Sequence, residues 1–218
     1  MDGDGAGGLP SAALAATLET VRPTADGRCF DNVTSAWEAA RRGRSVLVLE
    51  RLQVGHQRAS SAGLERQWRI QYSEEQWSRL ALDTLPLWRA LESAAGTGLV
   101  HLTGSLWFGR VGVSTSEGEL RAAASVLERL GVGHDWLSAS EIEARFGYAR
   151  LPDDHEGFYQ PDGGVIDVRG TIDALRRVGA RAGVGLRENT RVRSLVRARH
   201  DGSSAMSRLV SAEWAGSR

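Results

Sequence analysis

The sequence predicts an α/β fold with a smaller antiparallel insert. Three observations support it. A helical pattern, a glycine and a continuous apolar run follow one another over residues 33–50. Two further helical patterns, at 116–131 and 168–183, alternate with short strand-like runs. The run GFYQPDGGVID reads as strand, turn and strand, which places antiparallel pieces in the middle of the chain.

The first elements follow from local signals. Residues 1–24 are rich in glycine and alanine and are predicted to form a poorly ordered tail. The helical pattern from Val33 to Arg42 ends at Gly43, a typical helix stop. The run SVLVLE, ending at Glu50, has the continuous apolar character of a buried parallel strand.

A long helix is predicted after the polar loop GHQRASSAG. Ser73 stands three residues before Gln76, the spacing of a capping box. The helix should reach about Ala95, with Pro86 inside it. We expect one face of it to be apolar and to pack in the core: Trp77, Leu80, Leu85, Trp88 and Leu91.

The remaining elements complete the alternation. LVHLTG and SLWFGR predict two short strands, and the helix over 116–131 ends at Gly131. Ser138 precedes Glu141 by three residues, so a short capped helix is expected near 140–146. After the helix at 168–183, GLREN and TRVRSLVRA predict two closing strands.

Composition excludes several classes of function. The 218 residues carry no net charge, which gives no support for a nucleic-acid or membrane partner. No apolar run approaches the ~18 residues of a membrane span. The single cysteine excludes a disulfide framework and a cysteine-based zinc site, and the five histidines lack metal-ligand spacing, so no metal site is predicted. The acidic opening lacks a signal peptide's basic region, and a cytoplasmic location is predicted.

The chain also contains no lysine, since every basic residue is arginine. Schiff-base chemistry, a P-loop lysine and a lysine general base are therefore impossible for this chain.

An acidic residue at a strand end is the first candidate for a binding role. In dinucleotide-binding units, an Asp or Glu about 20 residues past the first glycine binds a ribose hydroxyl. Glu50 stands at a suitable distance from Gly27. The other glycine positions of G-x-G-x-x-G hold Cys29 and Asn32, whose side chains would intrude on the phosphate and the helix contact. A solvated carboxylate at a strand end remains the alternative.

Two arginines form the second candidate. Arg66 and Arg69 stand three residues apart and would share one face of a helical turn. Paired guanidinium groups can hold a carboxylate or a flavin oxygen with two hydrogen bonds. A solvated basic face is the alternative, because R-x-x-R arises easily where arginine is the only strong cation.

Longer stretches carry a resemblance to a known family. RRGRSVLVLERLQVGHQRASSAGLERQWRIQY resembles the monomeric sarcosine oxidase and N-methyltryptophan oxidase group of FAD-dependent amine oxidoreductases, which are D-amino-acid-oxidase-like flavoproteins. GSLWFGR, FYQPDGGVIDVRGTIDALRR and GVGLRENTRVRSL match later landmarks in the same order, so the resemblance covers roughly 27–198. It implies an incomplete Rossmann-like FAD-binding domain over 25–97 and 164–218. Part of a mixed or antiparallel substrate-domain sheet would lie at 98–163.

The resemblance implies roles for particular residues. Gly27 would belong to the phosphate turn, Glu50 would bind the adenosine ribose, and the backbone of Val192 would contact the adenine. Ser60 and Ser61 would contact the flavin pyrophosphate and ring region. The catalytic candidates are two arginines, Arg66 beside the flavin and Arg69 at the substrate carboxylate.

The reaction implied is oxidation of a small amine or N-methyl amino acid. A hydride would pass from the carbon next to nitrogen to FAD, water would hydrolyse the imine, and oxygen would reoxidise the flavin to give peroxide. Family members have about twice this length, and their second half supplies the covalent flavin cysteine and an oxygen-activating lysine. A second flavin signature, Ala-Gly-x-Trp, lacks its glycine in LVSAEWAGSR.

We therefore expect a truncated member with little activity alone. Two alternatives stay open: a non-catalytic flavin-binding or ligand-binding module, and a half-enzyme that needs a partner chain. An apolar face left by the missing half would serve a partner or self-association.

Overall fold

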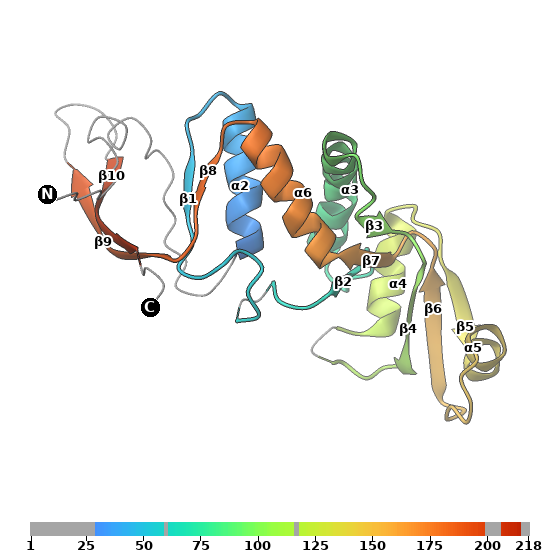
Figure 1. Ribbon diagram of the computed structural model, residues 1–218. Helices are drawn as coiled ribbons and strands as arrows, with labels where there is room; N and C mark the ends of the chain where they lie inside the picture. The colour runs from blue at the N-terminus through green and yellow to red at the C-terminus, as the bar shows by residue number, and fades with distance from the viewer. Residues whose placement is uncertain (1–28, 59–60, 116–117, 199–205, 215–218) are drawn as a thin grey trace, which may run out of the picture. The chain divides into compact units, whose positions relative to one another are not determined.

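The computed structural model describes residues 29–58, 61–115, 118–198 and 206–214. The chain divides into two compact units (Figure 1). We call residues 1–63 with 169–218 the terminal unit, and residues 64–168 the middle unit. This division places 64–97 with the middle unit, whereas the predicted FAD-binding domain extended to 97. The functional assignment of the two parts stays a prediction, and the predicted tail at 1–24 lies outside the described residues.

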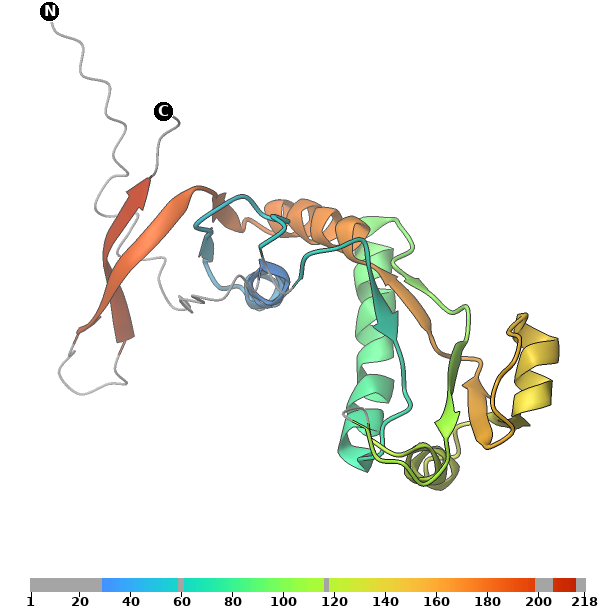
Figure 2. The same cartoon turned by 90° about the horizontal axis from the view of Figure 1, so that it is seen from below.

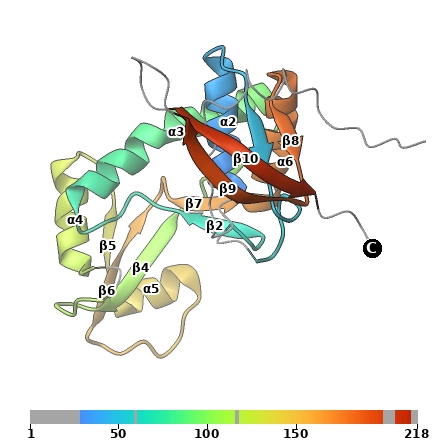
Figure 3. The same cartoon turned by 90° about the vertical axis from the view of Figure 1, so that its left-hand side faces the viewer.

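The terminal unit begins with helix α2 (Cys29–Arg41) and strand β1 (Leu47–Leu49). Helix α6 (Val168–Arg181), continuing from the middle unit, leads to β8 (Gly185–Arg187). The two strands pair in parallel and run side by side in Figures 1 and 3. The predicted parallel strand is therefore confirmed, and Gly43, with φ of 77°, ends the preceding helix as expected.

The two helices of this unit each bury one stripe. On α2 the buried residues Val33, Ala36 and Trp37 follow the three-and-four spacing of a helix face. On α6 the stripe is longer and comprises Ile172, Ala174, Leu175 and Val178. The helix α2 begins four residues before the predicted Val33, so Cys29 and Asn32 belong to its first turn.

A two-stranded antiparallel ribbon completes the terminal unit. Strand β9 (Thr190–Ala198) pairs with β10 (Met206–Trp214), from Thr190 opposite Trp214 to Ala198 opposite Met206. Figure 2 shows the two strands twisting around each other. The predicted closing strands are confirmed as β8 and β9, and the segment LVSAEW lies in β10.

The middle unit holds two three-stranded antiparallel sheets. One has the order β2-β7-β3, formed by β2 (Glu65–Trp68), β7 (Gly164–Asp167) and β3 (Val100–His101). The other has the order β4-β6-β5, formed by β4 (Ser105–Arg110), β6 (His155–Gln160) and β5 (Asp135–Ser138). The predicted strand, turn and strand at 157–167 exist, but β6 and β7 pair in different sheets instead of with each other.

Three helices accompany these sheets: α3 (Glu75–Ala95), α4 (Leu120–Arg129) and α5 (Ala139–Phe146). The core lies between α4 and the second sheet, where the fully buried Phe158 contacts Leu120, Leu127 and their neighbours. The Trp136 ring stacks on Phe158 with centroids 6.1 Å apart, and Trp107 packs at 6.0 Å. These aromatic contacts link the three strands of the sheet on the face that packs against α4.

The first residues of α5 and α3 show whether the two predicted capping boxes form. At α5 the Ser138 hydroxyl accepts from the Glu141 backbone, and the Glu141 carboxylate accepts from the Ser138 backbone, so this box is confirmed. At α3 the N-cap is Glu74, and its side chain makes no cap hydrogen bond. The predicted box of Ser73 and Gln76 is therefore wrong.

The burial of α3 also differs from expectation. Within this 21-residue helix only Ser78 and Leu91 are buried. Trp77 is 47% exposed and Leu80 is 52% exposed, although both were expected to pack in the core. Leu87 is exposed as well. A large part of the apolar surface of α3 thus faces away from the middle unit's core.

Candidate functional site

Glu50 occupies the carboxyl end of the parallel strand pair. Its backbone N–H donates to the Arg187 carbonyl at 2.9 Å, and its own carbonyl accepts from the Thr190 N–H at 2.8 Å. The carboxylate accepts from the Leu52 N–H at 2.9 Å. These bonds orient the acid at the strand end and connect it to the beginning of β9.

His56 lies beside this carboxylate and was missed by the sequence analysis. Its Nε2 is 3.7 Å from the Glu50 Oε1, and both side chains are nearly buried, at 13% and 11% exposure. Its Nδ1 accepts from the Arg58 N–H at 3.0 Å, so the ring proton lies on Nε2 and faces the carboxylate. His56 thus belongs to the turn that follows β1, where its N–H donates to the Gln53 carbonyl at 3.1 Å, and its ring lies beside the strand-end acid.

The position of α2 relative to Glu50 suits a bound nucleotide. A short turn joins α2 to β1, so the two elements run in opposite directions and the carboxyl end of β1, which Glu50 follows, lies at the end where α2 begins (Figure 1). A helix N-terminus attracts phosphate, and a strand-end carboxylate accepts ribose hydroxyls. The carboxylate of Glu50 is thus placed as a strand-end ribose acceptor requires. Gly27 lies outside the described residues.

The structure describes only some of the other predicted cofactor residues of the terminal unit. Val192 lies in β9, opposite Ala212 and two residues after Thr190, whose N–H reaches the Glu50 carbonyl. The hydrogen bond between Thr190 and Glu50 therefore brings Val192 near Glu50 in the fold. Ser61 is half-buried, and Ser60 lies outside the described residues.

The two predicted arginines belong to a strand and its end. Arg66 lies in β2, opposite Ile166 of β7, and Arg69 follows the strand directly. The assumption that the pair occupies a helical turn is therefore wrong, because this segment pairs as an edge strand. Arg66 is exposed and donates to the Glu65 carbonyl at 2.8 Å.

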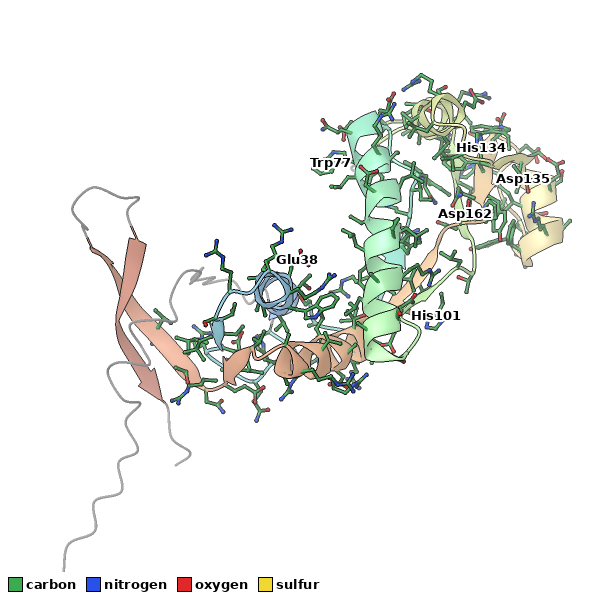
Figure 4. All side chains as sticks on the ribbon, turned by 90° about the horizontal axis from the view of Figure 1, so that it is seen from above. Glu38, Trp77, His101, His134, Asp135 and Asp162 are labelled. Carbon is green, nitrogen blue, oxygen red and sulfur yellow. The ribbon has the colours of Figure 1, made fainter. Side chains whose placement is uncertain are left out.

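Arg69 lines a cavity of about 570 Å³ that lies wholly within the middle unit. Its guanidinium carbon lies 4.6 Å from the centroid of the Tyr72 ring, which is a cation–π geometry. The same wall continues into the start of α3 with Ser73, Glu74 and Trp77. Figure 4 shows Trp77 near the N-terminal end of that helix. Arg66 does not line this cavity.

The opposite wall comes from the segment between β4 and α4: Ser114, Thr115, Gly118 and Glu119. Gly118 has φ of 105°, and a Cβ there would collide with the Ser73 hydroxyl. Glu119 caps α4, accepting from the Ala122 N–H at 2.8 Å and the Gly112 N–H at 3.2 Å. Burial raises the pKa of Glu119, but backbone N–H groups outweigh it and hold the pKa below its ordinary value. The cavity therefore combines an arginine with an ionised carboxylate.

Two kinds of feature are absent from the residues that the structure describes. No group of three or more His, Cys, Asp or Glu side chains among them has the geometry of a metal site. No helix in the described ranges is long and apolar enough to cross a membrane.

The parallel strand pair, its terminal acid and the adjoining helix start are typical of the dinucleotide-binding class of α/β proteins. Comparison with known proteins identifies the family within this class. The model of the FAD dependent oxidoreductase family matches residues 33–213, and the chain belongs to this family.

Similar proteins include several oxidases. Human peroxisomal sarcosine oxidase is 34% identical over 155 residues, which cover 69% of this chain and 38% of that protein. The monomeric sarcosine oxidase of Streptomyces avermitilis is 29% identical over 153 residues, covering 70% of this chain and 39% of that protein.

Solved structures agree with these relatives. NikD, described as an unusual amino acid oxidase essential for nikkomycin biosynthesis, shares 46% identity with a TM-score of 0.74. That match covers 84% of this chain and 45% of NikD. L-proline dehydrogenase from P. horikoshii shares the fold at 21% identity and a TM-score of 0.63. The chain thus spans less than half the length of these proteins.

Proposed function

We propose that this chain belongs to an enzyme that oxidises a small amine or amino acid with FAD. The observation that carries the proposal is the cavity lined by Arg69, in a chain of an FAD-dependent family whose similar members include sarcosine oxidases and an amino acid oxidase. When bound, FAD supplies the acceptor for a hydride from the carbon next to the substrate nitrogen.

The terminal unit would hold the cofactor. Glu50 accepts hydrogen bonds from the ribose hydroxyls, and the His56 ring lies beside the carboxylate, 3.7 Å from its Oε1. The backbone of Val192 contacts the adenine, and Ser60, Ser61 and Gly27 serve the pyrophosphate. Support comes from the bonds that fix Glu50 between Arg187 and Thr190.

The middle unit would hold the substrate. Arg69 binds the substrate carboxylate, and the ring of Tyr72 beneath it limits the positions that the guanidinium can take. Arg66 lies beside the flavin in this proposal. An arginine suits the carboxylate because its planar fork can donate two parallel hydrogen bonds.

The test is spectroscopic and kinetic. The purified chain is mixed with FAD, free cofactor is removed, and the visible spectrum is recorded. We expect weak FAD binding, seen as a small flavin band that tracks the protein, because Cys29 and Asn32 replace glycines of the phosphate turn, and only slow peroxide release with sarcosine or N-methyl amino acids. Absence of any bound flavin would contradict the proposal, and rapid peroxide release would contradict the low activity expected of the chain alone.

A second candidate is a half-enzyme that acts with a partner chain. Exposed apolar side chains on α3 favour it, since Leu80 and Leu87 lie seven residues apart on one side of the helix. The relatives contain more than twice the matched length. The occupant of this surface would be a polypeptide like the unmatched part of those relatives.

A cytoplasmic location is also proposed, and it rests on the sequence alone.

Size-exclusion chromatography and binding of a hydrophobic dye test the second candidate. We expect strong dye binding or self-association of the chain, and a reduction of both by the double variant Leu80→Glu with Leu87→Glu. A monomer that binds no dye would argue against an exposed docking surface.

A further inference from the structure

Trp77 is placed unusually for a tryptophan. It belongs to the first turns of α3, yet it is 47% exposed and lines the cavity instead of the core. Figure 4 shows the residue at that end of the helix. A large aromatic face at a cavity wall offers a flat apolar surface to a ligand, and aromatic rings prefer to pack against other planar groups.

The charges around the cavity are of both signs. Arg69 is held over the Tyr72 ring, and the ionised Glu119 is held by backbone N–H groups on the opposite wall. Glu74 adds a second carboxylate. The lining thus offers an opposite charge to each end of a ligand that carries both a carboxylate and an ammonium group.

The two walls approach closely at one point. Gly118 leaves no space for a Cβ beside the Ser73 side chain, so the segment 118–119 is fitted against the segment leading into α3. The cavity volume of about 570 Å³ lies in the range typical for small-molecule sites. This volume leaves space for a side chain as well as for the charged groups of an amino acid.

We propose that this cavity selects zwitterionic amino acids with a planar apolar side chain, and that Trp77 determines this preference. The proposal deepens the proposed function, and it rests on that function for the identity of the site. Arg69 takes the carboxylate, Glu119 with Glu74 takes the ammonium group, and Trp77 packs against the planar side chain. Trp77 acts on specificity and takes no part in the chemical step.

The test is calorimetric titration of the full chain without FAD. The probes are L-phenylalanine, L-alanine, 3-phenylpropionate without the amine, and phenethylamine without the carboxylate. We expect L-phenylalanine to bind about tenfold more tightly than L-alanine, a ratio worth about 1.4 kcal/mol. Both analogues that lack one charge should bind more weakly than L-phenylalanine.

Variants separate the role of Trp77 from a general loss of structure. Trp77→Ala should bring the ratio of L-phenylalanine to L-alanine affinity close to one, and Trp77→Phe should retain much of it. Leu102→Ala is the control, an exposed apolar residue of the middle unit outside the cavity lining, and should leave the ratio unchanged.

The outcomes are distinct for the two proposals. Equal binding of L-phenylalanine and L-alanine, no binding of either, or an unchanged ratio in Trp77→Ala would overturn the role of Trp77. A separate FAD titration reports on the proposed function. Failure to bind FAD together with a retained, Trp77-dependent preference would overturn the oxidase proposal and leave the amino-acid selectivity standing.

Discussion

The guanidinium carbon of Arg69 lies 4.6 Å from the centre of the Tyr72 ring, and both residues line the cavity of the middle unit. The ring attracts the cation and restricts its motion, so the arginine is oriented before any ligand arrives. Arg69 and Tyr72 are separated by only two residues, so the short segment between β2 and α3 carries this relationship.

Removing the Tyr72 ring should weaken carboxylate binding. We expect Tyr72→Leu to raise the Kd for L-phenylalanine about threefold, since an exposed cation–π contact contributes about 0.5–1 kcal/mol. Tyr72→Phe keeps the ring and should bind like the parent chain. The measurement is calorimetric titration, with Tyr148→Leu as the control, because Tyr148 packs on Phe108 outside the cavity. A Kd unchanged in Tyr72→Leu would show that Arg69 needs no such support.

Glu50 should determine cofactor affinity. In Glu50→Gln the side chain can still accept from the Leu52 N–H, but the charge that binds the ribose is lost. We expect the Kd for FAD to rise about tenfold, in line with about 1.5 kcal/mol for a hydrogen bond to a charged group. Glu38→Gln is the control, since Glu38 is a solvent-facing residue of α2 that pairs with Arg41 and Arg42. Equal FAD affinity of the two variants would contradict the assigned role of Glu50.

Glu92 should make the stability of the middle unit depend on pH. Its carboxylate accepts from the Leu99 N–H at 2.7 Å and the Val100 N–H at 2.8 Å. Burial raises the pKa of Glu92, but these N–H groups and the Arg89 guanidinium outweigh burial and lower the pKa below its ordinary value. The stabilisation is therefore complete above the pKa of the unfolded chain and is lost as the pH falls through the lower, folded pKa.

Thermal melts of Glu92→Gln at several pH values check this expectation. At pH 7 the variant should be less stable by about 2 kcal/mol, the contribution of hydrogen bonds to a charged group. The difference in stability between the variant and the parent chain should shrink below about pH 4. In that range Glu92 of the parent chain becomes protonated and loses its charge, so it resembles the neutral glutamine. Glu128→Gln, an exposed position of α4, should show no difference at either end. A difference that stays constant down to pH 3 would contradict the linkage.

Gly164 should tolerate no side chain. A Cβ at this position of β7 would collide with the backbone of His101 in β3 and of Thr103 beyond it. Because a backbone cannot move aside cheaply, we expect Gly164→Ala to lower the free energy of unfolding by about 2 kcal/mol or more. Gly109→Ala in β4 is the control, since a Cβ there meets no atom within 4 Å. Denaturant unfolding followed by tryptophan fluorescence measures both, and equal midpoints would refute the close approach.

Local sequence signals predicted the elements that depend on neighbouring residues alone. The glycine after α2, the apolar run of β1 and the Ser138 capping box all act within a few residues, and each is confirmed. The same capping pattern failed at Ser73, because its side chain lies against Gly118 instead of capping α3. A contact between distant segments thus overrode a correct local motif.

The candidate site was harder to predict for the same reason. Arg66 and Arg69 have the spacing of a helix face, but pairing of their segment with Gly164–Asp167 makes it a strand. The cavity is lined by Trp77 and Glu119 together, and no local sequence pattern predicts that two residues so far apart in the chain lie at one site. His56 carried no signal beyond its position six residues after the strand-end acid.

The turn at 161–163 has a consequence for the speed of folding. It separates β6 from β7, yet these strands join different sheets and give the middle unit no hairpin at this point. Instead, Glu65 of β2 pairs with Asp167 of β7, about a hundred residues away in the sequence, and Ser105 of β4 pairs with Gln160 of β6. Closing such long loops costs chain entropy before any contact compensates for it, and chains with distant contacts reach the native state slowly. During that delay the unpaired strands are exposed to other chains, so dilute solution and low temperature should favour recovery of the native protein over aggregation.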